Sequence, residues 1–391
     1  MINKHNKHSL GKLLVLALAL ICLVPASLDA VAAAPVKVKN VVLLDANTNL
    51  AYIPGRVLNG FAETRVQWNP SEKKLHIAKG ELRITLQAGS TMAYVNEETR
   101  ILTSAPFTEA GTAYLPLQVV KDILQVPIKW NKETASVSFG QAEKQLTLPY
   151  MTRSTAANQG KAIVSERKSF KIGSRSFKVQ TVTISLMDPK VQLKVALAGD
   201  EIGKVEDLSS LAKRHKAVVA VNGTFFNAYT SEAHKAPYGY IVSNGELKMI
   251  AGGDKRTIFA YDSNLLTQLI PGTAFTDAFA EGNIEGALQA GPRLVVDGKV
   301  AIDVKTEGFK DPKILTGGGA RSALGITRDH KLILLTTGGA TIPQLAEIMK
   351  QAGAYQAMNL DGGASSGLYY NGKYLTSPGR KISNALLVTY P

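Results

Sequence analysis

The chain has 391 residues, 45% hydrophobic and 19% charged, which is ordinary for globular protein and predicts two or three domains with sizeable cores. The formal net charge of +14 favours anionic surroundings, such as a wall polymer or a phosphate-bearing substrate, although a solvated basic surface without a partner gives the same balance. Aromatic residues are not interleaved with a basic patch, so nucleic acid is not an expected partner.

Residues 1–34 have the pattern of a secretory signal peptide. An uninterrupted apolar run at 13–24 is preceded by lysines and followed by small residues through Ala34. The run is shorter than the roughly 20 apolar residues that span a bilayer, so no transmembrane segment is expected after cleavage; a retained anchor is the alternative. We therefore expect a secreted or cell-wall-associated extracellular protein.

The only cysteine, Cys22, lies inside this segment, and Leu20 and Ile21 before it lack the small residue that a lipoprotein signal requires. The mature chain would hold no cysteine, which excludes disulfides and thiolate chemistry. Export without disulfides fits a bacterial protein better than a eukaryotic one. The aspartates lack calcium-loop spacing and the histidines do not cluster, so we expect no cofactor, with a structural calcium left open.

Residues 36–148 contain an internal repeat. Tyr52-Ile-Pro-Gly-Arg56 leads to Trp68, and Tyr114-Leu-Pro-Leu-Gln118 leads to Trp130 with the same spacing. Each copy predicts a short helix (57–62 or 119–124), a strand around the tryptophan, a turn and a second strand (75–78 or 135–139). The repeat therefore predicts a small duplicated α+β domain. It resembles the copper amine oxidase N-terminal-like domain, which implies an attachment or spacer module; without a histidine cluster it does not imply copper.

Residues 149–168 are polar and small and predict a linker, so that the second domain comprises 169–391. Turns at Asn244-Gly245 and Asp297-Gly298 predict hairpins. Thr341 caps a predicted helix at 342–352, which Gly353 ends. The other expected elements are strands at 177–186, 191–198, 217–221, 320–326, 331–337 and 357–360, and a helix at 205–215.

Asp361 comes directly after the last of these apolar strands and is followed by two glycines and two serines. In an open α/β sheet, ligands bind beyond the carboxyl ends of the strands. A carboxylate beside bare amides and hydroxyls therefore predicts a sugar or phosphate site. The alternative is a tight turn in which Asp361 only hydrogen-bonds the backbone.

Four segments share a resemblance in chain order: NGTFFN at 222, AGPRLVVDGK at 290, ARSALGIT at 320 and NLDGGASSGL at 359. Together they resemble the phosphodiester glycosidase family over about residues 170–391. The resemblance implies a mixed, curved sheet with flanking helices, so the fold class expected for the whole chain is α+β or mixed α/β. Family members often have aspartate at Thr337 and glycine at Ala290, which puts the substrate in doubt more than the chemistry.

The resemblance also implies a cleft that cleaves the sugar–phosphate bond of a sugar-1-phosphodiester. Asp361 is the predicted catalytic carboxylate, as nucleophile or as base toward water, because a phosphate leaves well without a second carboxyl group. Arg321 is predicted to hold the phosphate during catalysis; a surface ion pair is the alternative. The predicted substrate-binding residues are Asn222, Gly223, Asn227, Gly291, Arg293, Asn359, Gly362, Gly363, Ser365 and Ser366.

These features predict a hydrolase near the cell wall or an exopolysaccharide, acting on a phosphate-bearing glycan. A non-catalytic binder of anionic wall glycopolymer is the main alternative, because such a module needs the same phosphate and sugar contacts. An exopolysaccharide assembly factor is another, and would need partner proteins that the sequence does not reveal. The sugar and its anomeric configuration do not follow from the sequence.

Overall fold

The computed structural model describes residues 38–141, 144–153 and 160–391, so the predicted signal peptide lies outside the described part. Strands dominate, with 44% of residues against 15% in helices. No helix in the described ranges is long and apolar enough to cross a membrane. The mixed fold class is thus confirmed only in its coarse form, because several sheets carry most of the structure.

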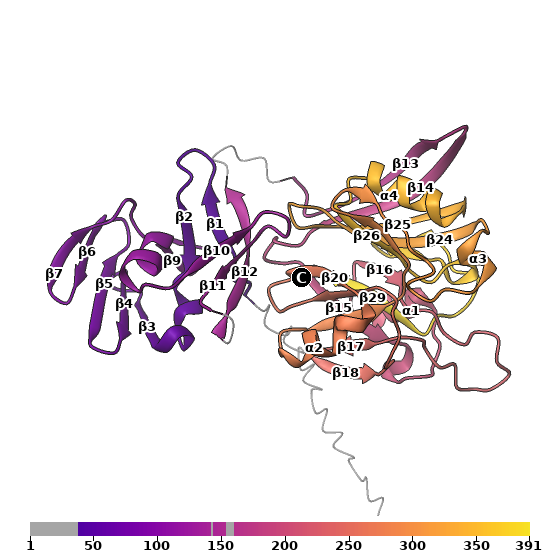
Figure 1. The fold of residues 1–391 in the computed structure, drawn as a ribbon, viewed down its shortest axis with the longest axis horizontal. Coiled ribbons are helices and arrows are strands. Elements are labelled where there is room, and N and C mark those ends of the chain that lie inside the picture. The colour runs from indigo at the N-terminus through magenta and orange to yellow at the C-terminus, as the bar shows by residue number, and fades with distance from the viewer. Residues whose placement is uncertain (1–37, 142–143, 154–159) are drawn as a thin grey trace, which may run out of the picture. The chain divides into compact units, whose positions relative to one another are not determined.

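Residues 42–153 form two sheets (Figure 1). The first is a five-stranded antiparallel meander of β3 (Thr64–Asn69), β4 (Lys74–Lys79), β5 (Leu82–Gln87), β6 (Met92–Val95) and β7 (Glu98–Ile101). The second has the order β10-β11-β12-β1-β2-β9-β8, with β1 (Val42–Asp45), β2 (Ala51–Pro54), β8 (Phe107–Glu109), β9 (Thr112–Pro116), β10 (Ile128–Asn131), β11 (Ser136–Phe139) and β12 (Leu146–Arg153). In this second sheet β1 and β12 pair in parallel.

The two copies of the repeat adopt the predicted strand pairs in different sheets. Trp68 of β3 lies opposite Leu75, and Trp130 of β10 lies opposite Val137. A π-helical turn, Val119–Ile123, agrees with the helix predicted in the second copy. The helix predicted at 57–62 is wrong: two 3₁₀ turns, Gly55–Leu58 and Phe61–Glu63, flank Gly60, whose φ of 82° breaks the helical path.

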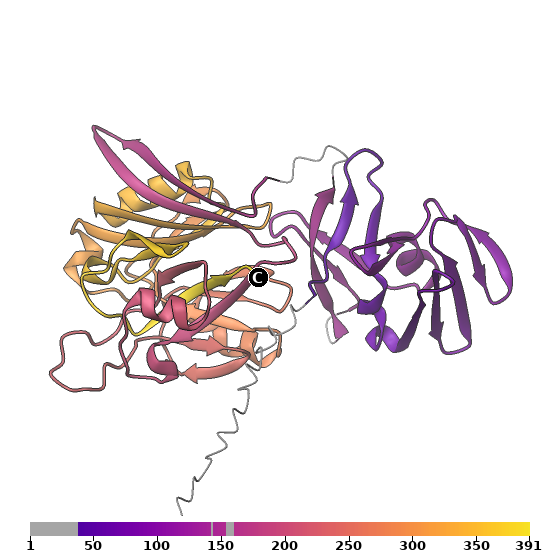
Figure 2. The same ribbon diagram turned by 180° about the vertical axis from the view of Figure 1, so that it is seen from behind.

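Residues 163–389 form three further sheets (Figures 1 and 2). The largest has the order β13-β14-β25-β24-β26-β22-β23, with β13 (Ile163–Ile172), β14 (Arg175–Ser185), β22 (Arg293–Val296), β23 (Lys299–Val300), β24 (Gly319–Ile326), β25 (Lys331–Ala340) and β26 (Gln356–Asn359). The second consists of β15 (Gln192–Leu197), β16 (Val219–Asn222), β27 (Leu368–Tyr370), β28 (Lys373–Thr376) and β29 (Asn384–Thr389), and the third of β17 (Ile241–Ser243), β18 (Glu246–Met249), β19 (Ile258–Tyr261), β20 (Thr267–Ile270) and β21 (Gly286–Gln289).

In the seven-stranded sheet of residues 163–389, the central strands are buried on both faces, which explains their nearly continuous apolar runs. Along β25, Ile333 and Leu335 face helix α4 (Ile342–Gln351), whereas Leu332 and Leu334 face the two five-stranded sheets. Helices α1 (Leu208–Arg214) and α2 (Phe275–Ala280) contribute to the cores on the outer faces of those smaller sheets. The short helix α3 (Pro312–Leu315) contributes Ile314 to the same core as α4.

The mixed sheet expected from the family resemblance is corrected by the pairing. Neighbouring strands in all three sheets of residues 163–389 are antiparallel. The predicted β25–α4–β26 unit exists, and Thr341 caps α4 by accepting from the Gln344 amide. However, β24 lies between β25 and β26, so the two parallel strands of this crossover are not neighbours.

The predicted linker at 149–168 is also shorter than expected. Strand β12 continues through Arg153, where Tyr150 and its neighbours pair with β1. Strand β13 begins at Ile163 and pairs with β14 along its whole length. The polar side chains that suggested a linker thus belong partly to strands, in which alternate positions face water. The hairpin of β13 and β14 projects beyond the rest of its sheet in Figures 1 and 2.

Candidate active site

Three strand ends meet at the turn that carries Asp361. Strand β26 ends at Asn359, and β24, running the opposite way, places Ala323 beside it. Strand β16 of a different sheet ends at Asn222, and the Asp361 amide donates to the Gly223 carbonyl at 3.0 Å. The loops after β16 and β26 are therefore held together by backbone hydrogen bonds, although they lie almost 140 residues apart in the sequence.

Asn222 is the side chain that joins the two sheets at this point. It is 1% exposed, and its Nδ2 donates to the Asp361 carbonyl at 2.7 Å. Its Oδ1 accepts from the Ser322 hydroxyl at 2.7 Å and from the Gly367 amide at 3.0 Å. The prediction that Asn222 binds substrate is therefore corrected: its polar atoms are used within the protein, and it fixes the backbone that carries Asp361.

The Asp361 carboxyl group lies half-buried at the start of the turn. Burial raises its pKa from 3.8 to about 7, while hydrogen bonds from Ser365 and the Gly362 amide and the charge of Arg380 act in the opposite direction. The Gly362 amide donates to Oδ1 at 2.9 Å. A carboxyl group that titrates near neutrality is suited to proton transfer or attack.

Arg321 is largely hydrogen-bonded within the protein. It is 4% exposed, and its Nε donates to the Ala340 carbonyl at 3.0 Å. Its Nη2 donates to the carbonyls of Lys313 and Gly317 at 2.7 and 2.8 Å. Through these three backbone acceptors the guanidinium fastens the end of α3 and the start of β24, while Nη1 would lie 3.7 Å from a Cβ on Gly362, so the catalytic role of Arg321 stays a prediction.

Arg293 is likewise bound within the protein. Its Nη1 donates to the Leu269 carbonyl at 2.9 Å and its Nη2 to Gln356 Oε1 at 2.5 Å. Burial lowers the pKa of this guanidinium, with Glu307 and Asp297 opposing the change. These contacts link β22 to β26 of its own sheet and to β20 of another sheet, and the contact of Arg293 with substrate stays a prediction.

The remaining predicted residues divide by exposure. Gly363 is exposed and Gly362 and Asn227 are half-buried, so these three lie at the surface of the loops around Asp361. The residues that are instead buried, and that shape the site from below, are Gly223, Gly291, Asn359, Ser365 and Ser366. Asn359 Nδ2 donates to the Gly291 carbonyl at 2.8 Å, whereas Asn359 Oδ1 and Ser366 Oγ have no partner among the described residues.

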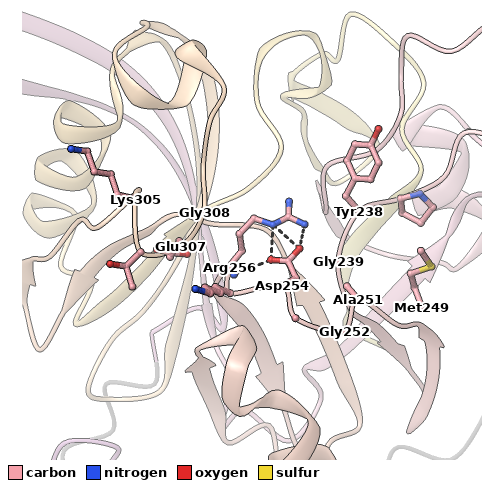
Figure 3. Close-up of a pocket in the computed structure, with 14 residues that line it drawn as sticks. Tyr238, Gly239, Met249, Ala251, Gly252, Asp254, Arg256, Lys305, Glu307 and Gly308 are labelled. Carbon is pink, nitrogen blue, oxygen red and sulfur yellow. Dashed lines mark hydrogen bonds and ion pairs between the residues drawn. The ribbon is translucent and has the colours of Figure 1, made fainter.

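A cavity of about 690 Å³ opens beside these loops, and Figure 3 shows its lining. Asp254 and Arg256 form an ion pair at its centre, Lys305 and Glu307 lie on one side, and Tyr238 on the other. The guanidinium carbon of Arg256 lies 5.6 Å from the ring centre of Phe225, in the loop after β16. None of the twelve predicted site residues lines this cavity.

Glu307 is the most enclosed carboxyl group of this cavity. Its Oε2 accepts from the Thr257 amide at 2.8 Å and from the Thr257 hydroxyl at 3.0 Å, and its Oε1 accepts from the Arg293 amide at 2.6 Å. Gly291 lies so close that a Cβ there would stand 2.8 Å from Oε2. Glu307 therefore fastens its loop to the start of β22, and burial raises its pKa while these donors lower it.

Three residues near Asp361 were missed by the sequence analysis: Tyr229, Lys313 and Arg380. Arg380 Nη2 donates to the Tyr229 hydroxyl at 2.9 Å, and Lys313 lies over the same ring. They come from two separate loops and from helix α3, so no local pattern joins them. The one available signal was the Pro378-Gly379 turn, which places a cation directly before the last strand.

Family comparisons agree with the two resemblances. Residues 215–389 match the model described as phosphodiester glycosidase, and residues 31–139 match the model described as copper amine oxidase N-terminal domain. The match places a region similar to phosphodiester glycosidases at residues 215–389. This supports a hydrolase of the phosphodiester glycosidase class and implies a phosphodiester glycan as substrate. No curated protein matches the chain.

Solved structures show the same fold at low identity. A hypothetical protein from Synechocystis superposes with a TM-score of 0.53 and 16% identity, covering 88% of this chain and 95% of that one. The catalytic domain of zebrafish N-acetylglucosamine-1-phosphodiester alpha-N-acetylglucosaminidase, auto-inhibited by its pro-peptide, has a TM-score of 0.51 and 21% identity over 60% of this chain and 85% of that one. At such identities the likeness concerns the fold alone.

Proposed function

We propose that the protein hydrolyses a sugar-1-phosphodiester with Asp361 as its catalytic carboxylate. The observation that supports this most directly is the half-buried Asp361 carboxyl group, held at the junction of β16, β24 and β26 with a pKa near 7. A carboxylate at the anomeric carbon stabilises the oxocarbenium-like transition state. The family match supplies the class of reaction, and the turn supplies the group to perform it.

The reaction consumes one water molecule. The bond between the anomeric carbon and the phosphate oxygen breaks, and the phosphate monoester leaves with the electron pair. Water supplies the new hydroxyl group of the sugar and its proton passes to a base, for which Asp361 is placed. Asp361 acts either as this base or first as a nucleophile; in both cases its ionised form is required.

The substrate that we propose is a phosphate-bearing glycan of the cell wall or of an exopolysaccharide. The lysine-flanked apolar segment at residues 1–34 supports export, and the formal charge of +14 supports an anionic polymer. The N-terminal module, which matches the copper amine oxidase N-terminal domain, would attach or space the hydrolase at that polymer. No cofactor is part of this proposal.

The experiment is product release by the purified protein from a panel of sugar-1-phosphodiesters, with Asp361→Asn alongside. Free sugar from the unaltered protein that is lost in the variant supports the proposal. Release that survives the substitution keeps the reaction but assigns it to another carboxylate. Binding to teichoic-type polymer without any release contradicts the proposal and makes the protein a glycopolymer-binding module.

A further inference from the structure

Arg321, which was expected to hold the phosphate, and Arg293 donate most of their side-chain hydrogen bonds to acceptors within the protein, so a bound phosphate needs further cations. Arg380 and Lys313 lie near the Asp361 turn and could contact a phosphate bound there. Within the described residues neither forms an ion pair with a carboxylate. Two cations without a carboxylate partner, one on helix α3 and one on the loop before β29, add little to stability by themselves, which favours a ligand between them.

Tyr229 holds the two cations together. Its ring centre lies 4.7 Å from the guanidinium carbon of Arg380 and 6.0 Å from Lys313 Nζ. Its hydroxyl accepts from Arg380 Nη2, which leaves the other guanidinium N–H groups for a ligand. Tyr229 is 79% exposed, so it is not part of a hydrophobic core. Its ring contacts are instead those with the two cations.

Backbone contacts fix Arg380 against the turn. The Gly379 amide donates to the Ala364 carbonyl at 2.7 Å, and Pro378 packs so tightly against Gly367 that a Cβ there would lie 2.3 Å away. Arg380 is itself half-buried and interacts electrostatically with Asp361. Its loop therefore presents the guanidinium at the edge of the turn, close to the proposed catalytic group.

We propose that Arg380 and Lys313, organised by Tyr229, bind the phosphate of the substrate on the leaving-group side of Asp361. This inference rests on the proposed function. A guanidinium offers a planar fork to two phosphate oxygens, and an ammonium group adds a point charge. The leaving phosphate gains negative charge as its bond to the sugar breaks, so the cations stabilise the transition state more than the bound substrate.

The first test compares a substrate that has a phosphate leaving group with one that has no phosphate. Arg380→Met and Lys313→Met are each expected to lower kcat/KM for a methyl sugar-1-phosphodiester by about 10- to 100-fold. The same variants are expected to change the hydrolysis of the neutral p-nitrophenyl glycoside of that sugar by less than about threefold, because no phosphate is present. Lys381→Met is the matched control, since Lys381 is exposed and adjacent to Arg380. Equal losses on both substrates would overturn the inference, since they would mean that Arg380 acts only through Asp361.

The second test is calorimetric binding of inorganic phosphate, which does not depend on turnover. We expect binding by the unaltered protein and by Lys381→Met, and about tenfold or greater weakening in Arg380→Met. Binding that is absent, or equal in all variants, overturns the inference. If phosphate binds through Arg380 while no phosphodiester is cleaved, the inference stands and the proposed hydrolysis fails. Circular dichroism spectra that match between variants separate these outcomes from misfolding.

Discussion

Asp361 and Glu307 are two half-buried carboxyl groups in different loops, and they differ in what surrounds them. Each oxygen of Glu307 accepts from a backbone amide, and Oε2 also accepts from the Thr257 hydroxyl. Asp361 accepts from one backbone amide, of Gly362, and from Ser365, and its pKa rises to about 7. Burial alone therefore does not identify a catalytic carboxylate; the balance between desolvation and hydrogen-bond donors does.

The difference also appears in what each group holds in place. Glu307 joins its own loop to Thr257 and to the start of β22, so its carboxylate oxygens serve to hold the fold together. Asp361 is instead the group being held: its carbonyl accepts from Asn222 and its amide donates to Gly223. A reactive group that is positioned through its backbone keeps its side chain available for substrate. The variants below test this contrast.

The largest expected effect is on turnover. Asp361→Asn should lower kcat by about 1000-fold or more, because the amide neither accepts a proton nor attacks carbon. Glu307→Gln should keep kcat within about tenfold, since its oxygens serve the fold. Steady-state hydrolysis of the best phosphodiester by both variants provides the measurement. A comparable loss of kcat in the two variants would contradict the assignment of Asp361 as catalytic and Glu307 as structural.

The next effect is on stability. Asn222→Ala removes the donor to the Asp361 carbonyl and the acceptor of the Gly367 amide, leaving buried polar groups unpaired. We expect a loss of about 2 to 4 kcal/mol in the free energy of unfolding, measured by urea denaturation. Asn227→Ala is the control, because Asn227 is half-buried and its change should cost no more than about 0.5 kcal/mol. A small loss at Asn222 would show that the two sheets do not depend on this link.

The amide variants of the two carboxyl groups should also differ in the sign of their effect on stability at pH 8. The folded-state pKa of Asp361, about 7, lies above its model value of 3.8, so ionisation of this group destabilises the fold as the pH rises from about 4 to 7. Asp361→Asn should therefore stabilise the protein at pH 8 by about 1 to 3 kcal/mol, with no gain near pH 4.

Glu307→Gln should do the reverse at pH 8, because an amide nitrogen would face the Thr257 or Arg293 amide in place of an acceptor. The expected cost is about 1 to 3 kcal/mol. Thermal unfolding of both variants at pH 4 and pH 8 measures the two effects side by side. A stabilising Glu307→Gln would mean that desolvation outweighs its hydrogen bonds.

The sequence was sufficient for features set by local pattern. The alternation and capping around α4, the Asn244-Gly245 hairpin and the strand before Asp361 all appear as predicted. The internal hydrogen bonds of Arg321 and Arg293 were not predicted, because a glycine-rich context exposes backbone carbonyls as readily as amides, and only the fold shows which ones a guanidinium meets. The mixed sheet was misassigned because β24, earlier in the chain than β25, inserts between β25 and β26, and strand order is not a local property.

The smallest expected effect concerns the hydroxyl beside Asp361. The rate kcat/KM should rise with pH to a plateau above about 7, as Asp361 loses its proton. Ser365 hydrogen-bonds the ionised carboxylate and lowers its pKa, so Ser365→Ala should move this limb upward by roughly 0.4 to 1 pH unit, the equivalent of one hydrogen bond. Ser366→Ala is matched to it, because Ser366 Oγ is also buried but has no partner among the described residues, and its limb should not move. A pH profile in which both variants shift alike would mean that repacking, and not the Ser365 hydrogen bond, controls the proton affinity of Asp361.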